Sequence, residues 1–375
     1  MSINRRNALS LFAAFTFLSS GRGQYSAGSA QRLEAPTFSV TPVAFDGEWV
    51  WGKQPTDQKG WLDPRVFELE VGVRWRSEGN VRNLRFSTVA PVEFPEQRIL
   101  DFRIAASPGC SARVVPISDT VGQLQIGLER MERGQQMEAR AVYRLLISRY
   151  CPHFECSQFP AKQSYDLSIR EQGLGNSPGI QCDLDAIRAV IASIVNERDS
   201  AWAKAHKFYE WVWGNIRGRR GKYTSVQAAL SRRVGDCEER AAVFIALCRA
   251  VKIPSRLVWV PGHCWAEFCL CDRSGKPHWI PAHTAAYRWF GWTGAHEVIL
   301  QKGDRFSVIG KQSKVRLIAD WYSFQGRRPA IEFFGELKPI SRYDSDPGPG
   351  RRRKNKEGGW DLVDKHPAKS RIRDG

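Results

Sequence analysis

The sequence predicts an α+β protein with two domains. A β-sandwich-like domain covers residues 37–150, and a domain of helices packed on an antiparallel sheet covers residues 157–340. In the first part, apolar and polar residues alternate in short runs between turn-rich stretches, which is typical of strands with one buried face. In the second part, apolar residues recur at helical spacing and strand-like runs follow. The chain of 375 residues is long enough to bury two substantial cores.

The N-terminus has the pattern of an export signal. Arg5 and Arg6 precede an apolar run over residues 8–18, and small residues follow up to Ala30. The run is too short to span a bilayer comfortably, and paired arginines are typical of twin-arginine signals. We therefore expect residues 1–30 to be a signal peptide and the mature protein to be exported to the periplasm, cell envelope or extracellular space. The alternative is a short membrane-associated segment, and no other segment approaches the length of an integral membrane span.

The clearest strand of the first domain covers residues 67–75. Its apolar residues alternate with residues that are mostly charged, and they are Phe67, Leu69, Val71, Val73 and Trp75. Residues 124–128 repeat this pattern. Many short strands without helical periods predict a β-sandwich.

The second domain begins with two amphipathic helices, and a third helix starts near Cys237. Apolar spacing predicts the first two over residues 184–194 and 202–216. In the third, the apolar residues at helical spacing are Ala241, Phe244, Ile245, Cys248 and Val251. Extending this spacing backwards puts Cys237 on the same inward face of the helix.

Glycine and proline mark the ends of this third helix. Gly235 lets the chain turn sharply into it, and Pro254 ends it because the residue before a proline is pushed out of helical geometry. We expect the strand-like segments that follow to form the sheet of this domain, and they cover residues 256–260, 264–271, 314–322 and 330–334.

Cys237 and His263 are the candidate reactive pair. Cys237 lies at a helix start, where unpaired amide groups and the helix dipole favour a thiolate, although the charges of Glu238 and Glu239 are expected to oppose one. His263 stands at the start of a strand-like run, and a histidine beside a thiol can act as general base and acid. The alternative for Cys237 is a structural cysteine or half of a disulfide, and for His263 a hydrogen-bonded core histidine.

Four segments of the second domain form a recognisable set: AWAKAHKFYEWVWGNIR, ALSRRVGDCEERAAVFIALCRAVKIPSRLVWV, GHCWAEF and WIPAHTAAYRWFG. This set resembles the transglutaminase-like superfamily, a papain-like branch of thiol enzymes, over residues 184–305. The resemblance implies a papain-like core with a nucleophile at Cys237 and a catalytic histidine at His263. A β domain ahead of such a core is also common among the proteins that it resembles. We expect no cofactor and no metal.

The third catalytic residue of that family is usually an aspartate shortly after a Trp-x-Pro strand. Here Trp279-Ile280-Pro281-Ala282 is followed by His283, which becomes the candidate for this position. A neutral histidine can hydrogen-bond to the catalytic ring but supplies no negative charge. Thiol enzymes tolerate this better than serine enzymes, because a thiol is already partly ionised near neutral pH. The alternative is that His283 is a bystander.

The chain carries 56 Lys and Arg against 39 Asp and Glu, a net charge of +17. This excess points to acidic surroundings, and anionic cell-envelope polymers, membrane surfaces, acidic proteins and nucleic acid all qualify. No zinc-finger spacing or RNP-like aromatic pattern accompanies it. We therefore expect a protein or peptide substrate, an anionic cell-envelope polymer as a candidate partner, and no specific nucleic acid. Residues 341–375 predict a disordered basic tail.

Nine cysteines fit an exported protein that forms disulfides, with Cys237 as the free thiol and the other eight available for pairing. Cys151 and Cys156 bracket a loop short enough to be closed by a bridge. A zinc site with His153 between them is an alternative, but it lacks a fourth ligand at a recognisable spacing.

These observations leave three functions open. The first is a thiol enzyme that cleaves or transfers amide or isopeptide bonds through an acyl-enzyme, as a cysteine peptidase or amidase would. The second is a cross-linking transamidase, in which a lysine amine replaces water. The third is a catalytically silent member of the fold that serves as a binding or scaffold module.

Overall fold

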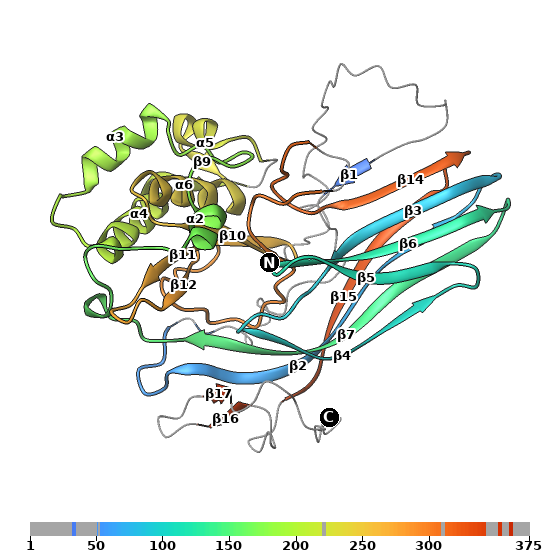
Figure 1. Cartoon of the computed structure of the whole chain (residues 1–375), viewed down its shortest axis with the longest axis horizontal. Coiled ribbons are helices and arrows are strands. Elements are labelled where there is room, and N and C mark those ends of the chain that lie inside the picture. Colours follow the sequence, from blue (N-terminus) through green and yellow to red (C-terminus); the bar gives the residue numbers. More distant parts are fainter. Residues whose placement is uncertain are drawn as a thin grey trace.

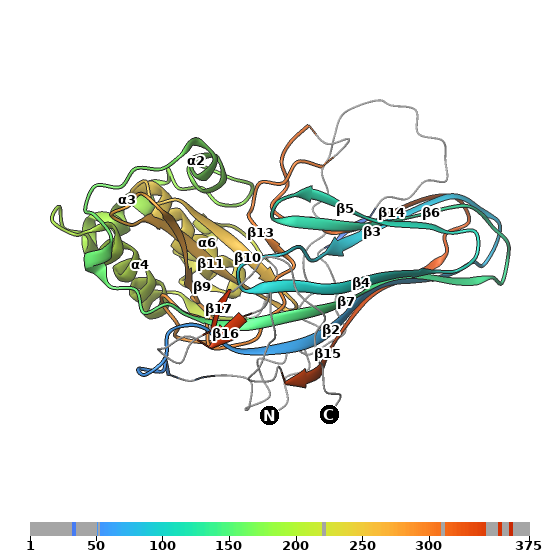
Figure 2. The ribbon, with the colours of Figure 1, turned by 60° about the horizontal axis from the view of Figure 1, so that its bottom comes forward.

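The computed structural model describes residues 32–34, 51, 53–219, 223–308, 312–342, 352–354 and 360–362. The helices gather at one end of the molecule, and long strands extend to the other (Figure 1). Viewed from another direction, the long strands form two layers (Figure 2). The structure therefore confirms the α+β class, with mostly antiparallel sheets. The signal peptide expected over residues 1–30 lies outside the described residues.

One layer is a six-stranded sheet with the order β16-β17-β2-β7-β4, in which β15 also pairs with β2. Its strands are β2 (Gly60–Arg76), β4 (Gln97–Ala106), β7 (Gln136–Cys151), β15 (Ala330–Arg342), β16 (Arg352–Lys354) and β17 (Trp360–Leu362). The last two lie inside the segment that the sequence predicts to be disordered, and most of the rest of that segment is outside the described residues.

The other layer belongs to a nine-stranded sheet with the order β1-β14-β3-β6-β13-β10-β11-β12, in which β5 also pairs with β6. Its strands are β1 (Arg32–Glu34), β3 (Val81–Ala90), β5 (Ser111–Ser118), β6 (Val121–Met131), β10 (Ser255–Val260), β11 (His263–Cys271), β12 (Pro277–Ala282), β13 (Gln301–Lys302) and β14 (Asp320–Gly326).

The two layers enclose one apolar core. The alternating residues predicted in β2 all point into it, and none of them is more than 1% exposed. Residues 124–128 of β6 face them from the other sheet, again with the apolar members buried. The alternation read from the sequence is therefore confirmed as the inner face of a sandwich.

The strands β14 and β15 pair differently from our expectation for residues 314–322 and 330–334. β14 pairs with β3, and β15 pairs with β2 along most of its length, so neither lies beside β10, β11 or β12. Apolar alternation shows that a strand has a buried face, but the partner of that strand comes from contacts distant in the sequence. After passing through the helical part, the chain thus returns to complete both layers of the sandwich.

The helices pack around a central one, α6 (Cys237–Ala250). Residues 238–249 of α6 are all buried, because β10 and β11 lie on one side of the helix and α3 (Asp185–Ile194), α4 (Ala201–Asn215) and α5 (Val226–Arg232) on others. The remaining helical elements are α2 (Leu167–Gly173) and a short 3-10 helix, Cys156–Gln158. All three helices predicted from apolar spacing are confirmed to within two residues at each end.

A Schellman-type cap ends α6 before Pro254 is reached. Lys252 has φ +65°, and the Ile253 N–H donates to the Cys248 carbonyl at 2.9 Å. The Lys252 N–H donates to the Arg249 carbonyl at 3.0 Å. The left-handed residue thus terminates the helix, and the proline prevents its continuation.

The short strand β13 joins the sandwich to the helical part. Gln301 pairs with Val121 of β6, while β13 also pairs with β10 through Trp259 and Val258. The nine-stranded sheet is therefore continuous from the sandwich to the strands that pack on α6.

A buried charge network reinforces this junction. Lys302 donates from Nζ to Glu267 at 2.7 Å and to Glu96 at 2.9 Å, and Arg256 donates from Nε to Glu267 at 3.0 Å. Burial alone would raise the pKa of Glu267, but Lys302 and Arg256 outweigh it and hold this pKa below its ordinary value. The network therefore links β10, β11 and β13 to the loop before β4 through fully paired charges.

Among the described residues, no helix combines the length and the apolar character that a membrane crossing requires.

We expect Glu267→Gln to lower the free energy of unfolding by about 3 kcal/mol, because it leaves two buried cations short of counter-charge. Urea unfolding monitored by tryptophan fluorescence measures this loss. Glu129→Gln is the matched control, since Glu129 pairs with Arg85 on the exposed surface, where a pair contributes no more than about 1 kcal/mol. Equal losses in the two variants would contradict the stabilising role of the network.

Candidate functional site

Cys237 is the first residue of α6, directly after the capping residue Asp236. The Asp236 carboxylate accepts hydrogen bonds from the N–H groups of Glu238 at 2.9 Å and Glu239 at 3.1 Å. The Glu239 carboxylate in turn accepts from the Asp236 N–H at 2.9 Å, which completes a capping box. These bonds fix the backbone on both sides of Cys237, whose half-buried thiol lies at the positive end of the helix.

Gly235 is required here for space. A Cβ at this position would lie 2.7 Å from the Cβ of Glu239, closer than carbon atoms approach without displacement. The same Glu239 carboxylate also accepts from the N–H and the hydroxyl of Thr224, at 2.9 and 2.6 Å. Glycine therefore lets Glu239 reach both the helix start and the loop before α5.

A two-residue turn sets the position of His263. Pro261 and Gly262 connect β10 to β11, so that Val260 and His263 are opposite one another in the hairpin. Gly262 has φ +70°, a left-handed value that glycine adopts without the penalty of a side chain, as the third residue of a type II turn does. The turn places His263 at the end of the β10–β11 hairpin, which packs on α6.

The structure brings Cys237 and His263 together, and Cys264 joins them. Hydrogen bonding with the Cys264 thiol, then with the His263 side chain, holds the pKa of Cys237 well below its ordinary value, although burial opposes this. The backbone amide of Cys264 contributes in the same direction. Burial raises the pKa of Cys264, which therefore stays a thiol and a donor. These contacts favour a thiolate at Cys237.

The acidic neighbours oppose that thiolate less than the sequence suggests. Burial raises the pKa of Glu238 to about 8 even though Arg316 forms an ion pair with it, so this carboxyl is largely protonated near neutral pH. Burial, and then the charge of Cys237, raise the pKa of Asp236 as well. The expectation that the Glu238 charge works against the thiolate is therefore corrected.

His283 lies next to His263 and is fully buried. Its ring stacks on Trp265, with centroids 4.5 Å apart, and meets the edge of Trp289 at 5.0 Å. Burial, then the charge of His263, lower the pKa of His283 well below its ordinary value, so the ring is neutral. Its Nε2 lies 3.3 Å from the Thr293 hydroxyl.

Two ring nitrogens in this arrangement stand out. His263 Nε2 and His283 Nδ1 are both buried, and neither has a hydrogen-bond partner among the residues that the structure describes. The charge of His263 acts on the His283 ring, so the two imidazoles are close enough to interact electrostatically. His283 thus stands where the sequence placed it, beside the candidate catalytic ring, without a direct hydrogen bond to it.

Sequence reasoning missed two features of the site. Cys264 is one of the cysteines that the sequence leaves available for disulfides, and its place directly after His263 gives no signal of its role, because successive side chains of a strand point to opposite faces. Arg240, one turn after Cys237 on α6, lies over the Trp213 ring at 4.2 Å. The only sequence signal for Arg240 is its spacing of three residues from Cys237, which puts both side chains on the same side of the helix.

All nine cysteines are free thiols in the structure, so the disulfide expectation is wrong for the described residues. Cys151 ends β7 and its sulfur contacts His153 Nε2 at 3.5 Å, whereas Cys156 contacts the Ser200 hydroxyl at 3.2 Å. The two thiols therefore face different neighbours and do not bridge the loop. No group of three or more candidate metal ligands occurs among the described residues, and His153 Nε2 lies 2.8 Å from the Gln58 carbonyl.

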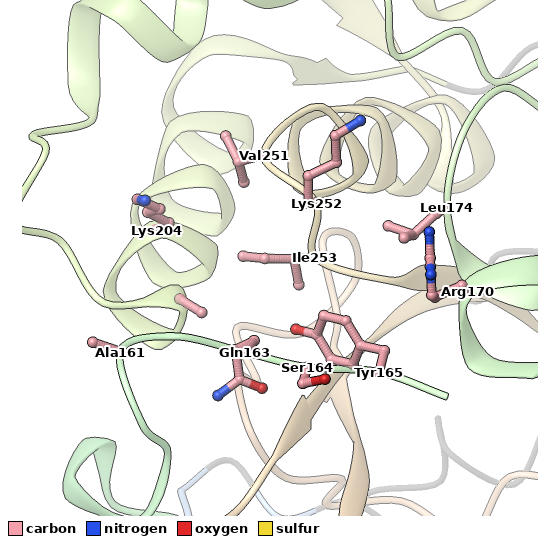
Figure 3. A pocket seen from close by; sticks show the side chains of 11 residues that line it. Ala161, Gln163, Ser164, Tyr165, Arg170, Leu174, Lys204, Val251, Lys252 and Ile253 are labelled. Carbon is pink, nitrogen blue, oxygen red and sulfur yellow. The ribbon is translucent and has the colours of Figure 1, made fainter. Parts of the chain in front are cut away.

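A cavity of about 390 Å³ lies at the other end of α6 (Figure 3). Residues 251–253 after the helix line it, together with Tyr165, Arg170 and Lys204. The helix has 14 residues, which puts the cavity about 20 Å from Cys237. It is therefore separate from the candidate site.

Residues 188–289 match the family model of the transglutaminase-like superfamily. The segment contains Cys237, His263 and His283, so the resemblance seen in the sequence is confirmed for this part of the chain. No curated protein matches the chain.

The crystal structure of a candidate cysteine protease from Cytophaga hutchinsonii is similar to this chain with a TM-score of 0.51 and 15% identity. The likeness covers 80% of this chain and 96% of that one, so it extends from the helical part into the sandwich, and at this identity it shows the fold alone. A candidate protease from Parabacteroides distasonis has a TM-score of 0.25 and 11% identity, over 59% of this chain and 43% of that one. The family model thus identifies residues 188–289 as a transglutaminase-like core.

We expect Cys264→Ala to raise the pKa of Cys237, because the variant removes the thiol that hydrogen-bonds to it. The rate of iodoacetamide alkylation at Cys237, followed by peptide mapping from about pH 5 to pH 9, should show its midpoint move to higher pH.

Cys248→Ala is the matched control, since Cys248 is also a buried thiol, within α6 itself, but has Ser255 as its partner instead of Cys237. An identical alkylation profile in the wild type and in Cys264→Ala would show that the Cys264 thiol does not stabilise the thiolate.

Proposed function

We propose that this protein is a thiol enzyme that cleaves or transfers amide or isopeptide bonds through an acyl-enzyme on Cys237. The observation that carries the proposal is the convergence of His263 and the Cys264 thiol on a cysteine at a capped helix start. The transglutaminase-like segment and the papain-like fold support it, because both belong to a scaffold that presents a cysteine in this way.

The reaction follows from the positions of these groups. The Cys237 thiolate attacks the carbonyl carbon of an amide, and the C–N bond breaks as the His263 ring gives a proton to the leaving amine. The acyl group is then held on Cys237 as a thioester. In the second step His263 accepts a proton from water, the water attacks the thioester, and the acid leaves with regeneration of the thiolate.

Charge develops on the carbonyl oxygen during both steps. The Asp236 carboxylate uses the N–H groups of Glu238 and Glu239, which leaves the Cys237 N–H as the first-turn donor able to face that oxygen. The helix dipole acts in the same direction.

The acceptor in the second step decides between hydrolysis and cross-linking. An amine such as a lysine side chain can replace water on the same thioester, and the product is then a new amide. Release of new amino termini indicates hydrolysis, whereas incorporation of a labelled amine indicates transamidation. Protein or peptide substrates fit both reactions.

His283 is proposed as a positioning residue for His263. We expect His283→Ala to lower the steady-state hydrolysis of p-nitrophenyl acetate by about 10- to 100-fold, mainly in kcat. His283→Asn should retain more activity, because an amide can still hydrogen-bond to the His263 ring. Cys237→Ala should abolish the reaction in every background.

His278→Ala is the control for this series, since His278 pairs with Asp272 away from Cys237 and should leave the rate unchanged. Equal rates for the wild type and His283→Ala would show that Cys237 and His263 work as a dyad. Full activity of Cys237→Ala would leave the thiol mechanism without support.

We also propose that the protein is exported, on the basis of Arg5, Arg6 and the apolar run over residues 8–18. N-terminal sequencing of protein from the native cells should then return a chain that starts near Gln31. An intact Met1 or Ser2 would contradict export through a cleaved signal.

A further inference from the structure

Positive charge collects beside the residues that lead into α6. The strand β8 (Arg217–Gly218) runs parallel to β9 (Val234–Gly235), and the Arg219 N–H donates to the Gly235 carbonyl at 2.9 Å. Arg217 and Arg219 therefore lie beside β9, the short strand that directly precedes Asp236 and Cys237. Both side chains are exposed, and neither forms an ion pair with any described residue.

The same edge carries two further arginines. Arg232 ends α5, and Arg233 follows it with φ +54°. The Arg233 guanidinium lies over the Trp211 ring at 4.9 Å and donates to Asn215 at 3.2 Å, and both arginines are exposed. Neither has an acidic partner within the described part of the chain.

Arg240 brings this charge to the site itself. It is 94% buried, one turn after Cys237, with its guanidinium between the Trp213 ring and β8, where a Cβ on Gly218 would lie 3.3 Å from Nη1. Its Nε has no hydrogen-bond partner among the described residues, and no ion pair involves it there. Cys237 is the anionic group that acts on this buried cation, and no carboxylate of the described residues pairs with it, so a carboxylate that reaches it is bound strongly.

The acidic residues nearby are already engaged. Asp236 and Glu239 complete the capping box, Glu238 contacts Arg316 and is largely protonated near neutral pH, and Glu210 pairs with Arg288. The surface formed by Arg217, Arg219, Arg232, Arg233 and Arg240, here called the arginine edge, therefore keeps its positive charge up to Cys237.

We propose that the acyl donor of this site is a peptide that carries carboxylate side chains next to the reacting amide, and that the arginine edge binds those carboxylates. The inference rests on the proposed function. Guanidinium groups bind carboxylates in bidentate geometry, and a positive edge raises the local concentration of an anionic substrate. A nucleic acid also fits the charge, but its phosphate backbone offers the thiolate no amide carbonyl. A peptide offers an amide within a few bonds of each carboxylate.

Two small alkylating reagents test the charge at Cys237 without a known substrate. Iodoacetamide is neutral and iodoacetate is anionic, and their rates at Cys237 in the full-length protein are compared with those at the thiol of N-acetylcysteine at low ionic strength. We expect a higher ratio of iodoacetate to iodoacetamide at Cys237. In Arg217→Gln/Arg219→Gln the ratio should fall by at least about threefold, whereas Arg328→Gln, on the sandwich, should leave it unchanged.

The double variant changes only exposed residues, so the test does not depend on the folding of an Arg240 variant. A ratio equal to that of N-acetylcysteine, or unchanged in the double variant, overturns the inference while normal iodoacetamide reaction keeps the proposed function. Failure of Cys237 to react with either reagent overturns the proposed function itself.

A second arm identifies the anion. Oligo-glutamate should protect Cys237 from iodoacetamide in the wild type, oligo-glutamine should not, and the protection should weaken in the double variant. Stronger protection by oligo-deoxythymidylate than by oligo-glutamate overturns the assignment of a peptide.

Discussion

The chemistry of this protein depends on the hydrogen bonds that cap α6. The carboxylates of Asp236 and Glu239 each accept a hydrogen bond from the other residue's backbone N–H. Gly235 leaves the space that the Glu239 side chain needs for this. The cap fixes Cys237 at the first helical position, against the hairpin end that carries His263. Since α6 is buried over almost its whole length, the surrounding helices and strands prevent it from sliding or turning, and the rest of the fold thereby orients a single thiol.

Burial and charge act together at this point. The Cys264 thiol and the His263 side chain lower the pKa of Cys237, the carboxyl of Glu238 is kept largely neutral near pH 7, and four of the five arginines of the arginine edge are exposed. A thiolate is thus stabilised by short-range donors, while the longer-range positive charge remains free to act on a ligand. The neutral, buried ring of His283 belongs with the short-range groups, because it can orient His263 without adding charge to the site.

The sequence predicted those parts of the structure that local patterns encode. Apolar spacing located α3, α4 and α6, alternation located the inner face of β2, and the motif around Cys237 and His263 located the site. Local patterns do not encode partners distant in the chain. The strand-like character of residues 330–334 was read correctly, yet β15 pairs with β2 across more than 250 residues of sequence. The same limit applies to the cysteines, because a thiol is paired or free according to neighbours that spacing does not reveal. The role of Cys264 became visible only when α6 and β11 were seen side by side.

The central claim is that Cys237 is ionised where an ordinary thiol is not. The ultraviolet absorbance of thiolate, measured as the difference between wild type and Cys237→Ser during a pH titration, tests this most directly. The account predicts that the difference is already present at about pH 6 and disappears only on further acidification. A difference that appears only near pH 8.5, the ordinary value for a free cysteine, would contradict it.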